Sequence, residues 1–384
     1  MRALLFTLAY GLQSVAAAST PVPADSGESV QASCSLSTFT KAGLLPQGAS
    51  IENVTSVPQN GAYGHNSATA DITWALNNID KKSDWGWRAI HGSVQLGKKL
   101  TEAYYGSPVT YSYYSGCSTG GRQGLKEIQT SPDSFDGALI GAAAWYTSHL
   151  NNYVVKLGMY NLPVTDPKHI PLALFSVLWA EVIRQCDGVD GVVDYIVSSP
   201  ELCKFDFTPI RCKGSASSSC FTDAQIGTAK KIYSDWYSSE DGRWLANGLT
   251  YSSEDQWYLY LNGTAPQAFG VEYVQDFLLN DPNWDWTTFN DSLVTYAEQH
   301  DPGNPTADQI NISPFKDRGG KIIMYHGQSD GIVPTKNSET YYNRTIDYFG
   351  DLESTTDFFR LFLIPVYHYG DELVVSSRIL GQET

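Results

Sequence analysis

The chain has 384 residues, six cysteines and a formal net charge of −16 at pH 7. This length suits one large or two modest domains with enough material for a hydrophobic core. The strongly acidic balance argues against a nucleic acid or an anionic membrane as a partner. Beyond the N-terminal segment, no apolar run approaches the length of a membrane-spanning helix.

The N-terminus has the pattern of a secretory signal peptide. Arg2 precedes an apolar run over residues 3–12, and three alanines stand just before Ser19. We therefore expect residues 1–18 to be a signal peptide and the mature protein to be secreted; a short buried helix is the alternative, which the following Ser-Thr-Pro disfavours. Behind a signal peptide the cysteines are expected to form disulfides. Five N-x-S/T sequons fit a secreted glycoprotein: Asn53, Asn262, Asn290, Asn311 and Asn343.

Helical and strand patterns alternate through the next part of the chain. Residues 87–105 place apolar side chains three and four positions apart, which predicts a helix. Residues 109–114 are β-branched and aromatic, which favours a strand, and helix-forming residues follow at 123–127. The short apolar run 135–144 predicts a buried parallel strand. This order is typical of an α/β sheet.

The pattern changes between residues 145 and 319. This part holds four of the six cysteines, three of the sequons and many aromatic residues. Its helical stretches include residues 171–184 and 222–237. We therefore expect residues 145–319 to be a lid domain inserted into the sheet domain.

Sheet character returns after the predicted lid. A strand is predicted over residues 321–325, a helix over 336–348 and a buried strand over 358–364. The expected catalytic domain therefore consists of residues 19–144 and 320–384.

A candidate nucleophile lies at the joint between the strand at 109–114 and the helix that follows it. The stretch Gly116-Cys117-Ser118-Thr119-Gly120 matches G-x-S-x-G. In a nucleophile elbow the serine occupies a sharp, strained turn, so its neighbours must be small. The pattern alone is common in loops, but its place between strand and helix predicts a serine hydrolase with Ser118 as nucleophile. The backbone N–H of Thr119 would then donate to the oxyanion, and a cysteine hydrolase using Cys117 is the disfavoured alternative.

In an α/β-hydrolase the acid and the histidine follow the serine in that order, each after a strand. Asp330 lies in the turn that leaves the strand at 321–325, where catalytic groups of such sheets collect. It is the candidate acid, and an ordinary Asp-Gly turn residue is the alternative. His368 is the only histidine after Asp330 and follows the strand at 358–364. It is the candidate general base, with a surface loop histidine as the alternative.

Three stretches closely resemble the fungal tannase and feruloyl esterase family: GCSTGGRQGLKEIQTSPDSFDGALIGAAAW, HGQSDGIVPT and CDGVDGVVDYIVSSPELCKFD. The resemblance covers most of residues 50–365. It implies an α/β-hydrolase fold with a large lid, with Ser118 as the nucleophile and Asp330 as the acid of a Ser-His-Asp triad. The implied substrates are feruloyl esters of plant cell-wall polysaccharide, and the alternative is a tannase acting on galloyl esters.

The chain departs from the family pattern in two places. The family's tail reads Pro-Gly-x-x-His-Cys, whereas this chain reads PVYHY from Pro365, so the cysteine that pairs with the one before the serine is absent. A block of N-terminal strands, including a Gly-rich segment expected to supply the second oxyanion donor, is also missing near residues 60–64. The sheet is therefore expected to be incomplete at this side. A truncated, catalytically inactive family member stabilised by calcium is the competing hypothesis.

Three aspartates lie among glycines in the stretch 186–203. Carboxylate oxygens in a flexible loop suit Ca²⁺, although the spacing is not that of an EF-hand and an Asp-rich turn is the alternative. The resemblance implies a structural calcium site in the lid, with these ligands: the carboxylates of Asp187, Asp190 and Asp194 and the backbone carbonyls of Val192 and Ile196.

The resemblance also implies two disulfides in the lid. A Cys186–Cys203 bridge would close the calcium loop, and a Cys212–Cys220 bridge would close the next loop. Cys34 and Cys117 lack the partners they have in the family, so each is a free thiol or they pair with one another.

Overall fold

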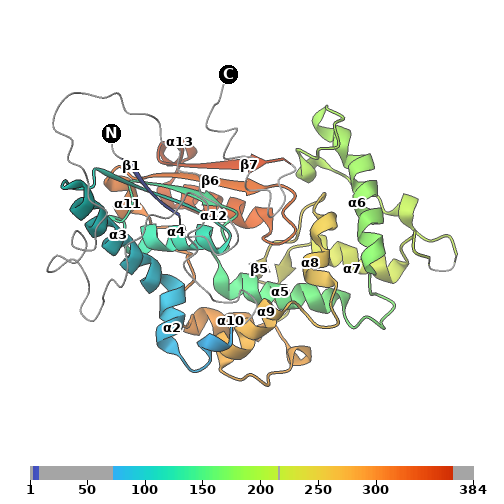
Figure 1. Ribbon diagram of the computed structural model, residues 1–384. Coiled ribbons are helices and arrows are strands. Elements are labelled where there is room, and N and C mark those ends of the chain that lie inside the picture. Colours follow the sequence, from blue (N-terminus) through green and yellow to red (C-terminus); the bar gives the residue numbers. More distant parts are fainter. Residues whose placement is uncertain (1–2, 8–71, 215–216, 366–384) are drawn as a thin grey trace.

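The computed structural model describes residues 3–7, 72–214 and 217–365 (Figure 1). Of the predicted functional residues, His368 and Cys34 lie outside this part of the chain. Among the residues described, no helix combines the length and the apolar composition needed to cross a membrane.

Five parallel strands form one sheet in the order β1-β2-β3-β6-β7. Their bounds are Ala3–Thr7 for β1, Tyr111–Cys117 for β2, Gly137–Gly141 for β3, Lys321–Gly327 for β6 and Phe359–Ile364 for β7. Strands β2, β3, β6 and β7 confirm the four strands predicted from the sequence. Strand β3 is shorter than predicted because the backbone of Ala142, at φ 34°, turns out of the extended conformation.

Strand β1 falls within the predicted signal peptide. It pairs with β2 from Ala3 opposite Tyr111 to Thr7 opposite Ser115. Among the described strands, removal of residues 1–18 would therefore leave β2 at the edge of the sheet, where its outer backbone N–H and C=O groups lose the partners that β1 supplies.

Helices pack on one face of the sheet. Helix α4 (Thr119–Thr130) contacts β2 and β3, and α12 (Thr335–Phe349) contacts β6 and β7. Alternate strand residues such as Ile140 and Met324 are buried in the same apolar cluster as residues of these helices. The intervening residues Leu139 and Ile323 are 39% and 48% exposed, so the other face is covered less by the described residues. Helix α3 (Ala89–Tyr105) confirms the helix predicted at 87–105, and α11 (Ser313–Asp317) and α13 (Leu352–Thr356) complete this part.

The region between β3 and β6 is mainly helical and has its own apolar core. This core is built from large side chains such as Tyr153, Leu178, Trp257 and Phe277. Its helices are α5 (Thr147–Asn161), α6 (Leu172–Cys186), α7 (Asp223–Tyr233), α8 (Tyr258–Leu261), α9 (Ala268–Glu272) and α10 (Ser292–His300). The region also contains 3-10 and π-helical segments: η3 (Asp187–Asp190), η4 (Pro200–Leu202), η5 (Thr208–Ile210), η6 (Glu254–Gln256), η7 (Tyr273–Leu279) and η8 (Trp286–Thr288).

Helix α7 shows how local chemistry sets the bounds of an element. It begins at a capping box in which Thr222 accepts from the backbone of Gln225, and the Gln225 side chain accepts from the backbone of Thr222. The helix ends at Tyr233, so the predicted helix over 222–237 is too long. Its last residues form the strand β4 (Trp236–Tyr237), which pairs antiparallel with β5 (Trp244–Ala246).

Two further features tie this region together. The segment before α3 consists of η1 (Thr73–Ala75), α2 (Ile79–Ser83) and η2 (Asp84–Arg88), and Ala75 is buried in the core of the inserted region. The disulfides Cys186–Cys203 and Cys212–Cys220 are both formed, as predicted.

Candidate active site

Ser118 occupies a strained turn between β2 and α4. Its backbone has φ 58° and ψ −120°, a conformation that a residue other than glycine adopts only when its surroundings enforce it. Three backbone hydrogen bonds hold the turn: the Ser118 N–H donates to the carbonyl of Gly141 at 3.0 Å, and its carbonyl accepts from the N–H groups of Arg122 and Ala144 at 3.0 and 3.1 Å. The predicted nucleophile therefore lies on a nucleophile elbow.

The glycines around the elbow permit a close approach of strand and helix. A Cβ atom on Gly116 would lie 2.8 Å from the backbone of Gly120, and one on Gly121 would lie 2.5 Å from the carbonyl oxygen of Gly141. Real Cβ atoms do not come so close to backbone atoms, so larger residues would push α4 away from the sheet. The requirement for small residues, inferred from the sequence, is confirmed.

The oxyanion donor predicted from the sequence lies at the start of a helix. Thr119 is the first residue of α4. The N–H groups of the first helical turn have no partner inside the helix and project outward from its N-terminal end. This position suits donation to a negatively charged oxygen. The segment near residues 60–64, where the sequence lacks the block expected to supply a second donor, lies outside the described residues.

Asp330 is buried in the loop that follows β6, at the same edge of the sheet as Ser118. Its Oδ1 accepts from the backbone N–H groups of Ile332 at 2.8 Å and Val333 at 2.9 Å. Its Oδ2 lies 3.2 Å from Nε2 of His326. Three donors therefore hold the carboxylate of the candidate acid.

The hydrogen bonds of His326 identify its tautomer. Its Nε2 faces the carbonyl of Val333 at 3.0 Å as well as the carboxylate of Asp330, and both can only accept, so Nε2 carries the hydrogen. In the neutral ring Nδ1 then accepts from the Ser338 hydroxyl at 2.7 Å. Both ring nitrogens of His326 are thus engaged by other groups and the ring is fully buried, so we do not assign it as the base for Ser118. The candidate base remains His368.

Side chains of the inserted region reach the loop that carries Asp330, which sequence reasoning did not predict. The Thr250 hydroxyl donates to the carbonyl of Gln328 at 2.6 Å, and the hydroxyls of Ser252 and Ser329 lie 2.6 Å apart. These partners are 77 and 78 residues apart in the chain. No periodic pattern in a sequence relates residues at such separations.

Arg122 was also missed, although it lies in the same motif as the nucleophile. It is buried on α4, donates to the carbonyls of Gly86, Trp85 and Pro305 at 2.7, 3.0 and 3.1 Å, and stacks over the Trp85 ring at 4.2 Å. Burial lowers the pKa of the guanidinium to about 10. Arg122 thereby ties α4, the helix that follows Ser118, to one segment earlier in the chain and to one segment later in it.

The three aspartates of the predicted calcium loop lie within the Cys186–Cys203 bridge. Asp187 Oδ1 accepts from the backbone N–H groups of Asp194 and Ile196, both at 3.1 Å. Asp190 Oδ1 accepts from Val192 N at 2.9 Å, and this bond, with a smaller contribution from Ser198, holds the pKa of Asp190 below its usual value.

The carboxylates of this loop do not converge on one point. In the part of the chain that the structure describes, no three His, Cys, Asp or Glu side chains are grouped so that they could hold a metal ion. Their oxygens bind N–H groups of the loop, so calcium binding would require the carboxylates to turn toward a shared centre. The calcium site stays a prediction.

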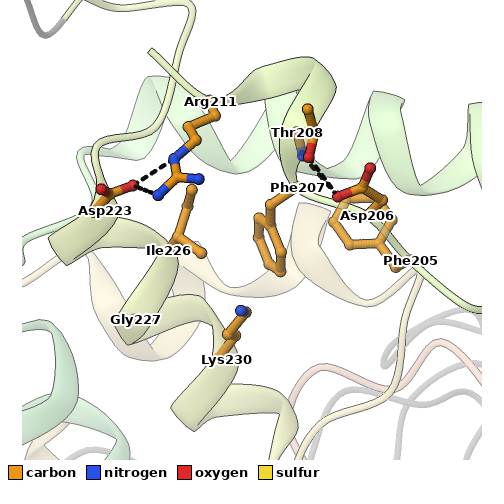
Figure 2. Close-up of a pocket in the computed structure, with 9 residues that line it drawn as sticks. All are labelled: Phe205, Asp206, Phe207, Thr208, Arg211, Asp223, Ile226, Gly227 and Lys230. Atoms are coloured by element: carbon orange, nitrogen blue, oxygen red, sulfur yellow. Dashed lines mark hydrogen bonds and ion pairs between the residues drawn. The ribbon is translucent and has the colours of Figure 1, made fainter. Parts of the chain in front are cut away.

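A pocket of about 310 Å³ lies between α7 and the segment from Phe205 to Arg211 (Figure 2). Phe207 and Ile226 form its apolar walls, Lys230 points into it, and Arg211 pairs with Asp223 at its rim. All its lining residues belong to the inserted region, and neither Ser118 nor Asp330 is among them.

Comparisons with known proteins agree with the resemblance found in the sequence. The family model described as tannase and feruloyl esterase matches residues 54–378. A probable feruloyl esterase B from Aspergillus niger is 36% identical over 312 residues, covering 80% of this chain and 59% of the relative. A probable feruloyl esterase B-1 from Aspergillus terreus is 34% identical over 317 residues, with the same coverage. This chain thus spans about three-fifths of the length of these relatives.

Solved structures give the same picture. The crystal structure of feruloyl esterase B from Aspergillus oryzae matches with a TM-score of 0.74 and 30% identity, covering 77% of this chain and 60% of that one. Tannin acyl hydrolase from Aspergillus niger matches with a TM-score of 0.57 and 23% identity, covering 76% of this chain and 59% of that one, which shows similarity of fold alone.

Proposed function

This chain belongs to the tannase and feruloyl esterase family and has an α/β-hydrolase fold, and we propose that it is a serine carboxylesterase acting on esters of aromatic acids. The observation that carries the proposal is the strained backbone of Ser118, at φ 58°, between β2 and α4. The candidate acid Asp330 follows β6 at the same edge of the sheet. Because the matched relatives are longer, the activity of the whole chain needs its own test.

The proposed mechanism follows the serine esterase scheme. The Ser118 Oγ attacks the ester carbonyl carbon while His368 takes the hydroxyl proton, and the Thr119 N–H donates to the oxyanion. The tetrahedral intermediate collapses when its bond to the alcohol oxygen breaks, and His368 returns the proton to that oxygen. Water then attacks the acyl-enzyme by the same steps, which releases the aromatic acid. Asp330 orients the imidazole and stabilises its charged form.

We propose feruloyl esters as the substrates. The crystal structure of a feruloyl esterase B is 30% identical to this chain with a TM-score of 0.74, whereas the tannin acyl hydrolase structure is 23% identical with a TM-score of 0.57. Galloyl esters, the substrates of tannases, are the second candidate. A catalytically inactive family member is the third, and the altered tail around His368 is the observation that favours it.

The purified protein is expected to release ferulate from methyl ferulate and to react with a fluorophosphonate probe. Ser118→Ala should abolish both. Ser112→Ala is a matched control, because Ser112 lies in β2, the strand that leads to Ser118, and its buried hydroxyl has no hydrogen-bond partner among the residues described. Probe labelling that survives Ser118→Ala would remove Ser118 from the nucleophile's role. Faster release of gallate from methyl gallate would favour the tannase alternative.

We also propose that the protein is secreted, with residues 1–18 removed, that it is glycosylated and that its lid binds calcium. The supporting features are the signal-like N-terminus, the sequons and the three aspartates enclosed by the Cys186–Cys203 bridge. N-terminal sequencing of protein from the culture medium tests the first point. A mature protein that begins at Ser19 would lack β1, whereas one that begins at Met1 would contradict the signal peptide.

A further inference from the structure

We propose that the inserted region positions the triad acid: Thr250, Ser252 and Gln256 form a clamp on the acid loop, defined as residues 327–331. This inference rests on the proposed esterase function. It extends that function by giving three residues of the inserted region a positioning role in the reaction.

The clamp holds the acid loop on both sides of Asp330. Before it in the chain, Thr250 donates to the carbonyl of Gln328 at 2.6 Å, and the hydroxyls of Ser252 and Ser329 are 2.6 Å apart. After it, the N–H of Gly331 donates to Gln256 Oε1 at 3.1 Å. These side chains are all buried, so water does not compete for the bonds.

The clamp supplies what the acid loop cannot supply for itself. The bonds of Asp330 to Ile332 and Val333 lie within its own turn, so they fix the carboxylate relative to that turn. The contact of Asp330 Oδ2 with His326 and the bond from the Gln328 N–H to the Ile364 carbonyl at 2.9 Å tie the loop to the sheet. The bonds to Thr250, Ser252 and Gln256 tie it to the inserted region, because these residues neighbour Leu249 and Trp257 of that region's separate apolar core.

The two segments approach so closely that the acid loop needs a glycine. A Cβ atom on Gly331 would lie 2.8 Å from the Gln256 Cβ and 2.9 Å from the Ser253 carbonyl oxygen. A larger residue at position 331 would therefore separate the clamp from the acid loop.

Ser252 has a strained backbone that a purely structural role does not explain. Its φ is 75°, in the left-handed region where glycine is the residue without strain. The Ser252 N–H donates to the buried carboxylate of Glu254 at 3.1 Å, which holds this conformation. A glycine would satisfy the backbone but would lose the hydroxyl that contacts Ser329. The strain is therefore associated with the side chain that reaches the acid loop.

Two substitutions at Ser252 separate the hydroxyl from the backbone. Ser252→Ala removes the hydroxyl and keeps the strain, whereas Ser252→Gly removes both. If the clamp positions Asp330, both variants should lower kcat for methyl ferulate about tenfold or more, with KM changed less than about twofold, because misplacement of a catalytic group by a fraction of an ångström affects the transition state. Ser252→Gly should do so without lowering the thermal midpoint further than Ser252→Ala.

The control is Ser253→Ala. Ser253 is equally buried and adjacent, but its hydroxyl bonds the Thr250 carbonyl and the Trp257 indole within the inserted region. It should lower the thermal midpoint and keep kcat within about twofold of wild type. Wild-type kcat in both Ser252 variants, or an equal loss of kcat in Ser253→Ala, overturns the clamp.

Labelling of the wild type by a fluorophosphonate separates the two levels of inference. If the wild type is labelled and the Ser252 variants hydrolyse methyl ferulate at the wild-type rate, only the clamp is overturned. A wild type that is not labelled overturns the proposed function, and the positioning role of the clamp with it.

Discussion

Glu254 provides a prediction whose size follows from the structure. The residue is fully buried beside the clamp, and its Oε1 accepts from the Tyr233 hydroxyl at 2.6 Å and from Ser252 N at 3.1 Å. Among the residues that the structure describes, none hydrogen-bonds its Oε2. Burial raises the pKa of this carboxyl from 4.5 to about 7, with a smaller contribution from the charge of Asp255 in the same direction.

The raised pKa makes the folded state bind a proton that the unfolded state has released. The stabilisation is fully present below pH 4.5, the value for the unfolded chain, and is lost as the pH rises through about 7. One pKa unit corresponds to about 1.4 kcal/mol, so the group should remove about 3 kcal/mol of stability between these limits. The other titratable groups that face it are Tyr233 and Tyr251, which stay neutral in this range because burial raises the pKa of both.

Glu254→Gln keeps the shape of the neutral carboxyl and cannot ionise. Relative to wild type, its free energy of unfolding should rise by about 3 kcal/mol between pH 4.5 and pH 8, because only the wild type then buries a charge. Urea unfolding at a series of pH values, followed by tryptophan fluorescence, measures this difference. Glu240→Gln, in the exposed turn between β4 and β5, controls for the change in net charge. A stability difference between Glu254→Gln and wild type that stays constant across this range would refute the reasoning.

Two further predictions concern the support of the elbow and the lid. Arg122→Met keeps most of the side-chain volume but leaves the carbonyls of Gly86, Trp85 and Pro305 without their donor, so urea unfolding should show a loss of about 3 kcal/mol or more; a loss below about 1 kcal/mol would contradict this. Calcium should raise the thermal midpoint of wild type after treatment with EDTA, because an ion that binds only the folded state stabilises it. Asp187→Asn should remove most of that rise, and an equal rise in wild type and Asp187→Asn would place the ion elsewhere.

Local chemistry allowed much of the catalytic domain to be predicted from the sequence. The elbow at Ser118 is recognisable because a sharp turn between a strand and a helix needs small residues at adjacent positions. This requirement involves only five consecutive residues, so the sequence shows it directly. The strands β2, β3, β6 and β7 follow from short runs of β-branched and apolar residues. Asp330 follows from its place in the turn after one of these strands. The two lid disulfides followed from a family resemblance and are formed.

The boundaries of some elements depended on neighbours that the local pattern does not contain. The helix predicted over 222–237 ends at Tyr233, because the residues after it pair with β5 to form β4. The segment before α3 contributes Ala75 to the core of the inserted region, although the chain separates it from that core by β2 and β3.

What holds the candidate acid was decided by tertiary structure alone. Thr250 and Ser252 reach the acid loop across 78 and 77 residues, and Arg122 reaches Pro305 across 183. A hydrogen bond between distant segments needs only one donor and one acceptor, so it leaves no period, spacing or composition that can be recognised in a sequence. Serine, threonine and arginine are also common on surfaces. Only the folded chain, by burying them beside the catalytic loops, distinguishes these residues from the many others of their kind.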